Sequence, residues 1–287
     1  MKFSLFMCSP EYYGIEYEIN PWMSLQRQAD RALARRQWEA LYGLLTGEIG
    51  VKVELIEPAP GLPDMVFTAN AGIALNGDFI SSNFRNKERQ DESRHFKDWF
   101  KKKGYRIFEL PPHQFFEGEG DLLFAGDTDA YAGYLIRSDV YSHAAVAEML
   151  DRRVVSLELV DGRFYHLDTC FCPLNEKSVV YYPTAFDTYA RQVIEANFPD
   201  RIELTEEEAL QFVANAIVIG DHYIQPPGGA RYLRRALQER GFEVHELEMS
   251  EFMKAGGATK CLVLKLAETS EGASGSVRDW SLFREKT

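Results

Sequence analysis

The sequence predicts an α/β fold in which five repeated units close into a ring, within a single domain spanning residues 1–268. Amphipathic helices rich in Arg, Glu and Ala alternate with short β-rich runs, which favours α/β over an all-helical fold or a sandwich. These runs lie 54, 49, 47 and 41 residues apart, spacings typical of repeated supersecondary units. Their starting residues are Val51, Tyr105, Val154, Arg201 and Phe242.

Each unit combines a helix, a short strand that ends in Glu-Leu or close to it, and a second apolar run carrying unusual polar residues. In the first strand, Val51-Lys-Val-Glu-Leu55, apolar and polar residues alternate as in a half-buried strand. Helices are expected over residues 24–45, 88–103, 140–152, 185–198 and 230–240. Strands are expected over residues 51–55, 105–110, 154–159, 201–204 and 242–247. Residues 269–287 are expected to form a polar C-terminal tail.

Composition limits the partners of the protein. The formal charge of −12 and the pI near 5.1 oppose a nucleic-acid backbone or an anionic membrane surface, so we expect a small-molecule substrate, no nucleic acid and no membrane. The four cysteines are scattered rather than framed for disulfides, which predicts free thiols and a cytoplasmic location. A homo-oligomer is left open.

Polar residues occupy matching places in the repeats, and a ring would bring them together at its centre. The fourth repeat offers Asn215, where we expect no catalytic group. The residues supplied by the other repeats are Asp64 and Asn70, Glu117, Glu119 and Asp121, His166 and Asp168, and Cys261.

Cys261 and His166 are the predicted reactive pair, because a thiolate can attack a carbon centre while an imidazole moves the protons. Cys261 lies between a Gly-Gly turn and the run Leu262–Leu266, where its sulfur would face a pocket. A buried apolar cysteine and a core histidine are the structural alternatives, and repeat position favours the functional interpretation. Asp168 is expected on the same face of a strand as His166, where it would orient the imidazole or hold substrate.

Asp64 and Glu117 suit a cationic, planar substrate group, because a guanidinium donates in a fork that carboxylates match. Glu119 and Asp121 are expected to be helix caps or solvated turn residues. The remaining histidines are expected at the surface. They are His95, His113, His143, His222 and His245.

No cofactor and no metal site are expected. The sequence lacks a GxGxxG or GxxxxGK[ST] phosphate loop, and the pair Cys170 and Cys172 lacks further ligands at zinc spacing.

The motifs resemble those of the amidinotransferase, or pentein, superfamily of guanidine-modifying enzymes, over nearly the whole chain. The resemblance implies a fivefold pseudosymmetric α/β propeller. The motifs that carry it are Ile19-Asn20-Pro21-Trp22-Met23, Leu62-Pro-Asp64-Met-Val-Phe-Thr-Ala-Asn70-Ala-Gly72, Phe116-Glu117-Gly, Gly133-Tyr-Leu-Ile-Arg137, His166-Leu-Asp168-Thr and Gly256-Gly-Ala-Thr-Lys-Cys261-Leu.

The same resemblance implies the roles of the site residues. Cys261 would form a covalent thiouronium adduct with the guanidinium carbon, and His166 would protonate the departing amine and then activate water. Glu117 would be the catalytic acid group, with Glu119 as its rival because Glu117-Gly-Glu119-Gly-Asp121 is one residue longer than the EGGD of many deiminases. Substrate would be bound by the remaining site residues. Asp64 would hold the guanidinium nitrogens together with Glu117, with Asn70 beside them, and Asp168 would help to hold the substrate. Arg89 and Arg137 would bind the α-carboxylate, and Asn20 the α-amino group.

Within the superfamily the chain looks most like the arginine dihydrolases, which convert arginine to ornithine, carbon dioxide and two ammonia without a metal. Dihydrolases carry asparagine at the position of Asn70, whereas deiminases and dimethylarginine dimethylaminohydrolases, which release citrulline, commonly carry aspartate. Those two activities are the first alternative. A Cys-His peptidase and an inactive binding protein of the same fold are the others. Long dihydrolases carry a second, C-terminal domain, so any later step on ornithine is expected to need another protein.

Overall fold

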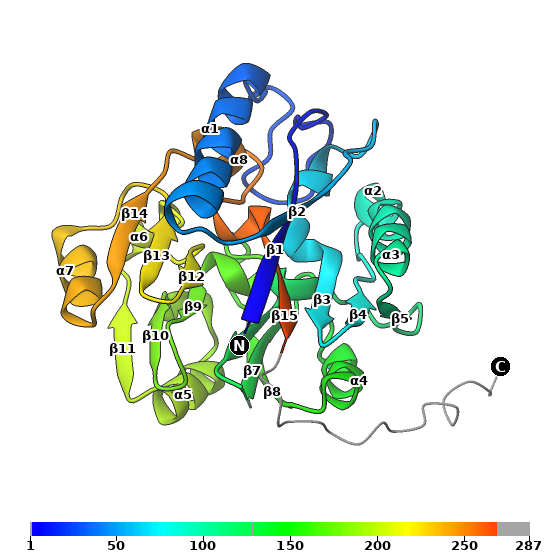
Figure 1. The fold of residues 1–287 in the computed structure, drawn as a ribbon. Coiled ribbons are helices and arrows are strands. Elements are labelled where there is room, and N and C mark those ends of the chain that lie inside the picture. Colours follow the sequence, from blue (N-terminus) through cyan, green and yellow to red (C-terminus); the bar gives the residue numbers. More distant parts are fainter. Residues whose placement is uncertain (1, 128, 269–287) are drawn as a thin grey trace.

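The computed structural model of the chain describes residues 2–127 and 129–268. It is a mixed α/β fold of several small sheets, in which one strand pattern recurs (Figure 1). The polar tail expected over residues 269–287 lies outside the described residues.

Five three-stranded units share one pairing pattern: two antiparallel strands, followed by a third strand parallel to the second. Parallel pairing of β15 with β3 joins the first two units into a six-stranded sheet. The units are β15 (Leu264–Glu268), β1 (Lys2–Cys8) and β2 (Val53–Ile56); β3 (Gly72–Leu75), β4 (Asp78–Ser81) and β5 (Arg106–Phe108); β6 (Leu122–Ala125), β7 (Asp129–Tyr134) and β8 (Arg153–Glu158); β9 (Phe171–Pro173), β10 (Ser178–Tyr181) and β11 (Asp200–Glu203); and β12 (Ile217–Ile219), β13 (His222–Gln225) and β14 (Glu243–Glu246).

A helical crossover connects the second and third strands of every unit, because parallel neighbours cannot be joined by a tight turn. Figure 1 shows these helices around the outside of the molecule. The crossovers are α1 (Arg31–Gly43), α2 (Lys87–Gln90) with α3 (Glu92–Lys102), α4 (Val140–Leu150), α5 (Thr188–Asn197) and α7 (Arg231–Glu239). Two short helices, α6 (Glu206–Leu210) and α8 (Ser250–Met253), precede β12 and β15.

The predicted helices and strands are present, with shifted ends. The helix expected over 24–45 begins only at Arg31, because the Asp30 side chain accepts from the backbone N–H of Leu33 and caps the first turn. It continues into a π-helical turn, Leu44–Glu48. The helix expected over 88–103 is divided at Asp91 into α2 and α3.

Aromatic side chains pack the crossover helix α3 against strands β4 and β1. Phe100 of α3 stacks on Phe79 of β4 with ring centroids 3.7 Å apart, and it also meets Phe6 of β1. All three rings are fully buried, and each stabilises the fold by about 1.5–3 kcal/mol through burial.

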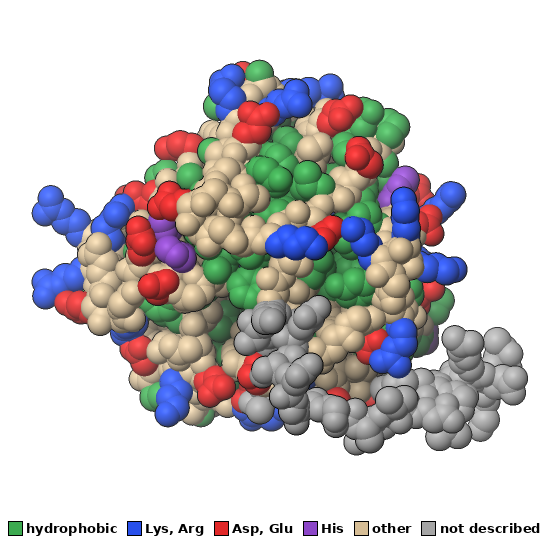
Figure 2. Space-filling view, viewed as in Figure 1, with side chains coloured by type: hydrophobic (Ala, Val, Ile, Leu, Met, Phe, Trp, Pro, Cys, Tyr) green, Lys and Arg blue, Asp and Glu red, His purple; other side chains and the backbone are tan. Residues whose placement is uncertain are grey.

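The surface is chemically mixed. Acidic and basic side chains are interspersed over the face shown in Figure 2. Among the residues that the structure describes, no helix has the length and apolar character needed to cross a bilayer.

Candidate active site

Short turns at the start of each unit carry the predicted polar residues. They lie before β3, β6, β9, β12 and β15, and the first three pack against one another in sequence, with the first also contacting the last. The turns are the 3-10 helices η3 (Thr68–Ala71), η4 (Gly118–Gly120), η5 (Leu167–Thr169) and η7 (Lys260–Leu262), and residues 211–215. Asp64 comes from a further 3-10 helix, η2 (Pro63–Val66).

All but two of the predicted site residues line one pocket, with an empty volume of about 260 Å³. The predicted residues in its wall are Asn20, Asp64, Asn70, Arg89, Arg137, His166 and Cys261. The other two, Glu117 and Asp168, are fully buried and bond directly to His166 and Cys261.

His166 is held by Glu117. Its Nε2 lies 2.9 Å from Glu117 Oε2, which also accepts from Arg137 Nη1 at 3.0 Å. Burial opposes ionisation of Glu117, but Arg137 and His166 together lower the pKa of its carboxyl well below the usual range. Burial lowers the pKa of His166 to about 4, against the opposing effect of Glu117. At neutral pH the site therefore contains a neutral imidazole beside an ionised Glu117.

Cys261 is paired with Asp168, not with the imidazole. Its thiol donates to Asp168 Oδ2 over 3.3 Å. Burial, followed by the neighbouring Asp168, raises the pKa of the thiol well above its ordinary value. Burial also raises the pKa of Asp168 to about 7, although Lys260 opposes this. A cation in the pocket would therefore favour both the ionised carboxyl and the thiolate.

The expectation that His166 and Asp168 share one face of a strand is wrong. His166 precedes the 3-10 helix η5, and Asp168 lies within it. A 3-10 turn sends side chains two residues apart in different directions, so His166 reaches Glu117 while Asp168 reaches Cys261. The strand after Cys261 likewise begins at Leu264 rather than Leu262.

Glu119 and Asp121 are also not solvated caps, because both are buried. Glu119 Oε2 accepts from Lys260 Nζ at 2.9 Å. Asp121 accepts from the hydroxyl of Ser138 at 2.6 Å and from the backbone N–H of Leu167 at 3.1 Å. The geometry therefore places Glu117, and not Glu119, against the imidazole.

Asn70 and Arg89 form a second buried network. Asn70 Oδ1 accepts from Arg89 Nη1 at 2.8 Å, and Asn70 Nδ2 donates to the carbonyl oxygen of Glu117 at 3.2 Å. A Cβ at Gly120 would lie 2.1 Å from Asn70 Nδ2, so only glycine leaves room for the amide. Arg89 also donates two hydrogen bonds of 2.8 Å to the carboxylate of Glu92. Glu92 is not among the residues predicted from the sequence.

Asn215 is the main residue that the sequence analysis missed. Its Oδ1 accepts from the backbone N–H groups of Ala258 (3.0 Å) and Cys261 (3.3 Å). Its Nδ2 donates to Asp168 O and to Cys261 Sγ, both at 3.1 Å. The side chain thus fixes the nucleophile loop to the loop of Asp168. Its place in the fourth repeat was the available signal.

Replacing Asn215 with alanine is expected to lower kcat by about 100-fold, because the loop of Cys261 loses its fixed geometry. The free energy of unfolding should fall by about 1–3 kcal/mol for the unpaired buried groups. The control variant is Asn175→Ala. The side chain of Asn175 also accepts from two backbone N–H groups, but it lies in an exposed turn. This variant should leave kcat unchanged; equal losses of kcat in both variants would contradict a positioning role.

Asp168→Asn is expected to abolish turnover and yet stabilise the protein above pH 7. The folded-state pKa of about 7 exceeds the ordinary value of 3.8, so ionising Asp168 costs the folded protein stability as pH rises between these values. The cost above pH 7 is at most about 4 kcal/mol. Urea unfolding at pH 8 should show the gain, and the two proteins should converge near pH 4. A less stable variant at pH 8 would refute this.

Three histidines expected at the surface are partly or fully buried. His143 of α4 is buried against Ser156, at 2.8 Å from its hydroxyl, and burial lowers its pKa to about 4. His222 and His245 lie on adjacent strands, with side chains only 23% and 11% exposed. Parallel pairing of β13 with β14 brings the two rings onto one face of a sheet, where neighbouring side chains cover them.

Comparison with known proteins gives long, close matches. The chain is 45% identical over 268 residues to the bifunctional arginine dihydrolase/ornithine cyclodeaminase ArgZ of Synechocystis, covering 92% of this chain and 38% of ArgZ. It is 40% identical over 260 residues to N(G),N(G)-dimethylarginine dimethylaminohydrolase of Mycobacterium tuberculosis, covering 91% and 84%. The chain therefore spans little more than a third of the length of ArgZ. No protein-family model matches.

A solved structure agrees with these matches. The N-terminal domain of an ArgZ variant, covalently bonded to a reaction intermediate, superposes with a TM-score of 0.89 at 44% identity, covering 93% of this chain and 98% of that domain. The fold and these relatives define the class of protein: the relatives are named as enzymes that act on arginine or dimethylarginine, and this chain is similar to them. The chain belongs to the pentein superfamily, as a homologue of the arginine dihydrolase domains and of dimethylarginine dimethylaminohydrolase.

Proposed function

We propose that this protein is an arginine dihydrolase, which hydrolyses L-arginine to L-ornithine, two ammonia and carbon dioxide through a covalent adduct on Cys261. The five strand units are then the blades of a fivefold pseudosymmetric propeller whose inner turns form the site. The observation that carries the proposal is a buried thiol and a neutral imidazole in one pocket, with Asp64 in its wall and with Glu117 and Asp168 bonded to the reactive pair. Carboxylates in this number call for a cationic ligand.

The first step uses the charge of the substrate. A guanidinium entering beside Asp168 lowers the pKa of the thiol, so that Cys261 can give its proton to the neutral His166. The sulfur then bonds to the guanidinium carbon, the C–N bond breaks, and His166 returns the proton to the leaving ammonia. Glu117 stabilises the imidazolium while it carries that proton. Tight coupling to Glu117 keeps the ring oriented.

Water completes the first hydrolysis and a second round completes the reaction. His166 takes a proton from water as the oxygen attacks the adduct carbon, and that proton returns to sulfur as the C–S bond breaks. The second proton of the attacking water passes to solvent, which leaves a neutral ureido product. The ureido product remains in the pocket beside Asn70. A second attack by Cys261 expels the second ammonia, and hydrolysis of that adduct leaves a carbamic acid that loses carbon dioxide to give ornithine. These steps need no metal.

The two arginines differ in what they can still bind. A guanidinium carries five N–H groups. Arg89 uses four of them on Glu92, Asn70 and the carbonyl oxygen of Asp64. Arg137 uses two, on Glu117 and the carbonyl oxygen of Ile19. We therefore assign the substrate α-carboxylate chiefly to Arg137, with Arg89 as a support for Asp64 and Asn70. Asn20 would contact the α-amino group.

The test is an assay of the purified chain with arginine and with dimethylarginine, in which ornithine, citrulline, ammonia and dimethylamine are all quantified. Arginine should give ornithine with two ammonia per turnover, and a chelator should leave the rate unchanged. Citrulline with dimethylamine from dimethylarginine would support the second candidate, a dimethylarginine dimethylaminohydrolase, which the 40% identity to the mycobacterial enzyme favours. Turnover of neither substrate would overturn both.

A further inference from the structure

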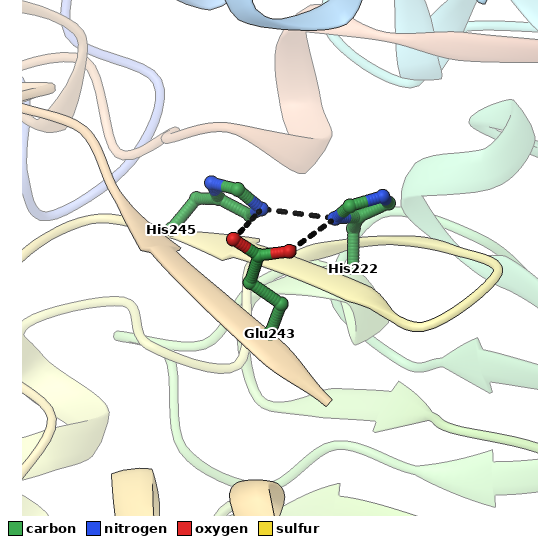
Figure 3. A group of neighbouring side chains, drawn as sticks. All are labelled: His222, Glu243 and His245. Carbon is green, nitrogen blue, oxygen red and sulfur yellow. Dashed lines mark hydrogen bonds and ion pairs between the residues drawn. The ribbon is translucent and has the colours of Figure 1, made fainter. Parts of the chain in front are cut away.

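A second cluster of reactive side chains lies outside the pocket. It consists of His222 on β13 with Glu243 and His245 on β14 (Figure 3). Their ligand atoms all lie within 4.8 Å of one another. None of the three lines the pocket that contains Cys261.

The strand register explains why these side chains meet. His222 is paired directly with Glu243 across the parallel ladder. His245 follows Glu243 by two residues, so both project from the same face of β14. β14 is an edge strand of its sheet, which leaves the cluster open on one side. Glu243 is 63% exposed, while the imidazoles are largely covered.

The distances suit a shared cation. His222 Nδ1 lies 3.0 Å from His245 Nε2 and 3.6 Å from Glu243 Oε2, and His245 Nε2 lies 4.0 Å from Glu243 Oε1. Neighbouring ligand atoms of a tetrahedral zinc ion, with bonds of about 2.0–2.1 Å, are about 3.3 Å apart. The three distances bracket this value, and the longest would have to shorten by about 0.7 Å. Figure 3 shows the two imidazoles facing each other, with one oxygen of Glu243 toward each ring.

A further carboxylate lies near the second ring nitrogen of each imidazole. The second nitrogen of His222, Nε2, lies 3.7 Å from Asp221 Oδ1. The second nitrogen of His245, Nδ1, lies 3.9 Å from Glu48 Oε1, on the π-helical turn after α1. Both distances are too long for hydrogen bonds, so these carboxylates act on the imidazoles through their charge, which favours a bound cation.

We propose that His222, Glu243 and His245 bind a divalent transition-metal ion of the zinc class, with one coordination position left to water. Two imidazoles and one carboxylate are the donor set that zinc accepts in open sites. The ion would link β13 to β14 and, through Glu48, draw in the turn after α1. Its role is to stabilise the fold, apart from the reaction in the pocket.

This group of ligands cannot be recognised from short spacing in the sequence. Here the ligands are 21 and 2 residues apart along the chain, from His222 to Glu243 and from Glu243 to His245. Only strand pairing makes them neighbours.

Zinc binding to the untagged, metal-free chain tests the proposal, measured by calorimetry and by metal content after dialysis. The experiment uses a Cys261→Ser background, which removes the thiol in the pocket as a competing ligand. We expect one zinc ion per chain, and an unfolding temperature that rises with zinc concentration because the site exists only in the folded protein. Cobalt should bind in place of zinc and produce the visible absorption of a four-coordinate ion.

Variants separate this site from other ligands. His245→Ala and His222→Ala should each weaken zinc binding by more than about 100-fold and remove the cobalt spectrum, and Asp221→Asn with Glu48→Gln should weaken it by about tenfold. His95→Ala, at an exposed histidine of α3, should change nothing. If an imidazole variant folds poorly, Glu243→Gln serves instead. Absence of zinc binding, or binding that survives loss of both imidazoles, would overturn the proposal.

Discussion

Replacing Cys261 with serine should lower kcat for arginine by at least about 10⁴-fold while arginine still binds. The loss is large because the sulfur forms the bond to carbon, and a hydroxyl in the same buried position has no accessible anionic form. The contacts of the pocket wall with substrate remain, so calorimetry should record arginine binding within about tenfold of the wild-type affinity. The change is a small one for the fold, since serine replaces a thiol of similar size.

Cys8 provides the matched control for that experiment. It is also a buried free thiol, in β1, but it does not line the pocket. Cys8→Ala should retain turnover within about twofold, and a thiol-reactive amidine should label the Cys8→Ala variant but not the Cys261→Ser variant. Full activity of Cys261→Ser, or labelling that persists in it, would exclude the covalent mechanism.

Replacing Asn70 with aspartate should shift the product from ornithine towards citrulline, by at least about tenfold in their ratio. Arg89 Nη1 can bond the new carboxylate as it bonds Asn70 Oδ1 now, so the pocket should keep its shape. The amide N–H groups are lost, however. One of them donates to the carbonyl oxygen of Glu117, and the other is available to the ureido oxygen of the intermediate.

The electrostatic reason reinforces the structural one. Arginine is a cation that an additional carboxylate attracts, whereas the ureido group is neutral and would present its oxygen to a negative charge. The lost donor and the added repulsion should weaken binding of the ureido intermediate by about 1–3 kcal/mol. Its retention in the pocket should then fall by a factor of about 10–100. Supplying citrulline as substrate checks this directly. Wild-type protein should convert it to ornithine and Asn70→Asp should not. An unchanged product ratio would refute the assignment of Asn70.

Most of the fold prediction rested on the five repeated helix–strand units of the chain. Helical and strand periodicities are local properties, so the five helix–strand pairs could be located within a few residues from the sequence. Their spacing also predicted that Asp64, His166 and Cys261 would meet, and all three line one pocket. The helix ends were less accurate, because a single cap such as Asp30 decides them.

Other features depended on contacts between residues far apart in the chain. Glu117 and Glu119 have different partners because they face different turns. Glu117 contacts His166, whereas Glu119 accepts from Lys260. The importance of Asn215 lies in its side-chain amide, which joins two loops that are distant in the sequence.

Residue types and their periodic order were thus enough to predict an α/β repeat fold and a meeting of Asp64, His166 and Cys261, and the resemblance of the motifs indicated the superfamily. Burial and strand register were not encoded locally, and they decide the protonation of His166 and Asp168 and the meeting of His222 with His245. The reason is physical: a pKa depends on the solvent and charges around a group, and a ligand cluster depends on cross-strand neighbours. Both come into existence only when the chain is packed.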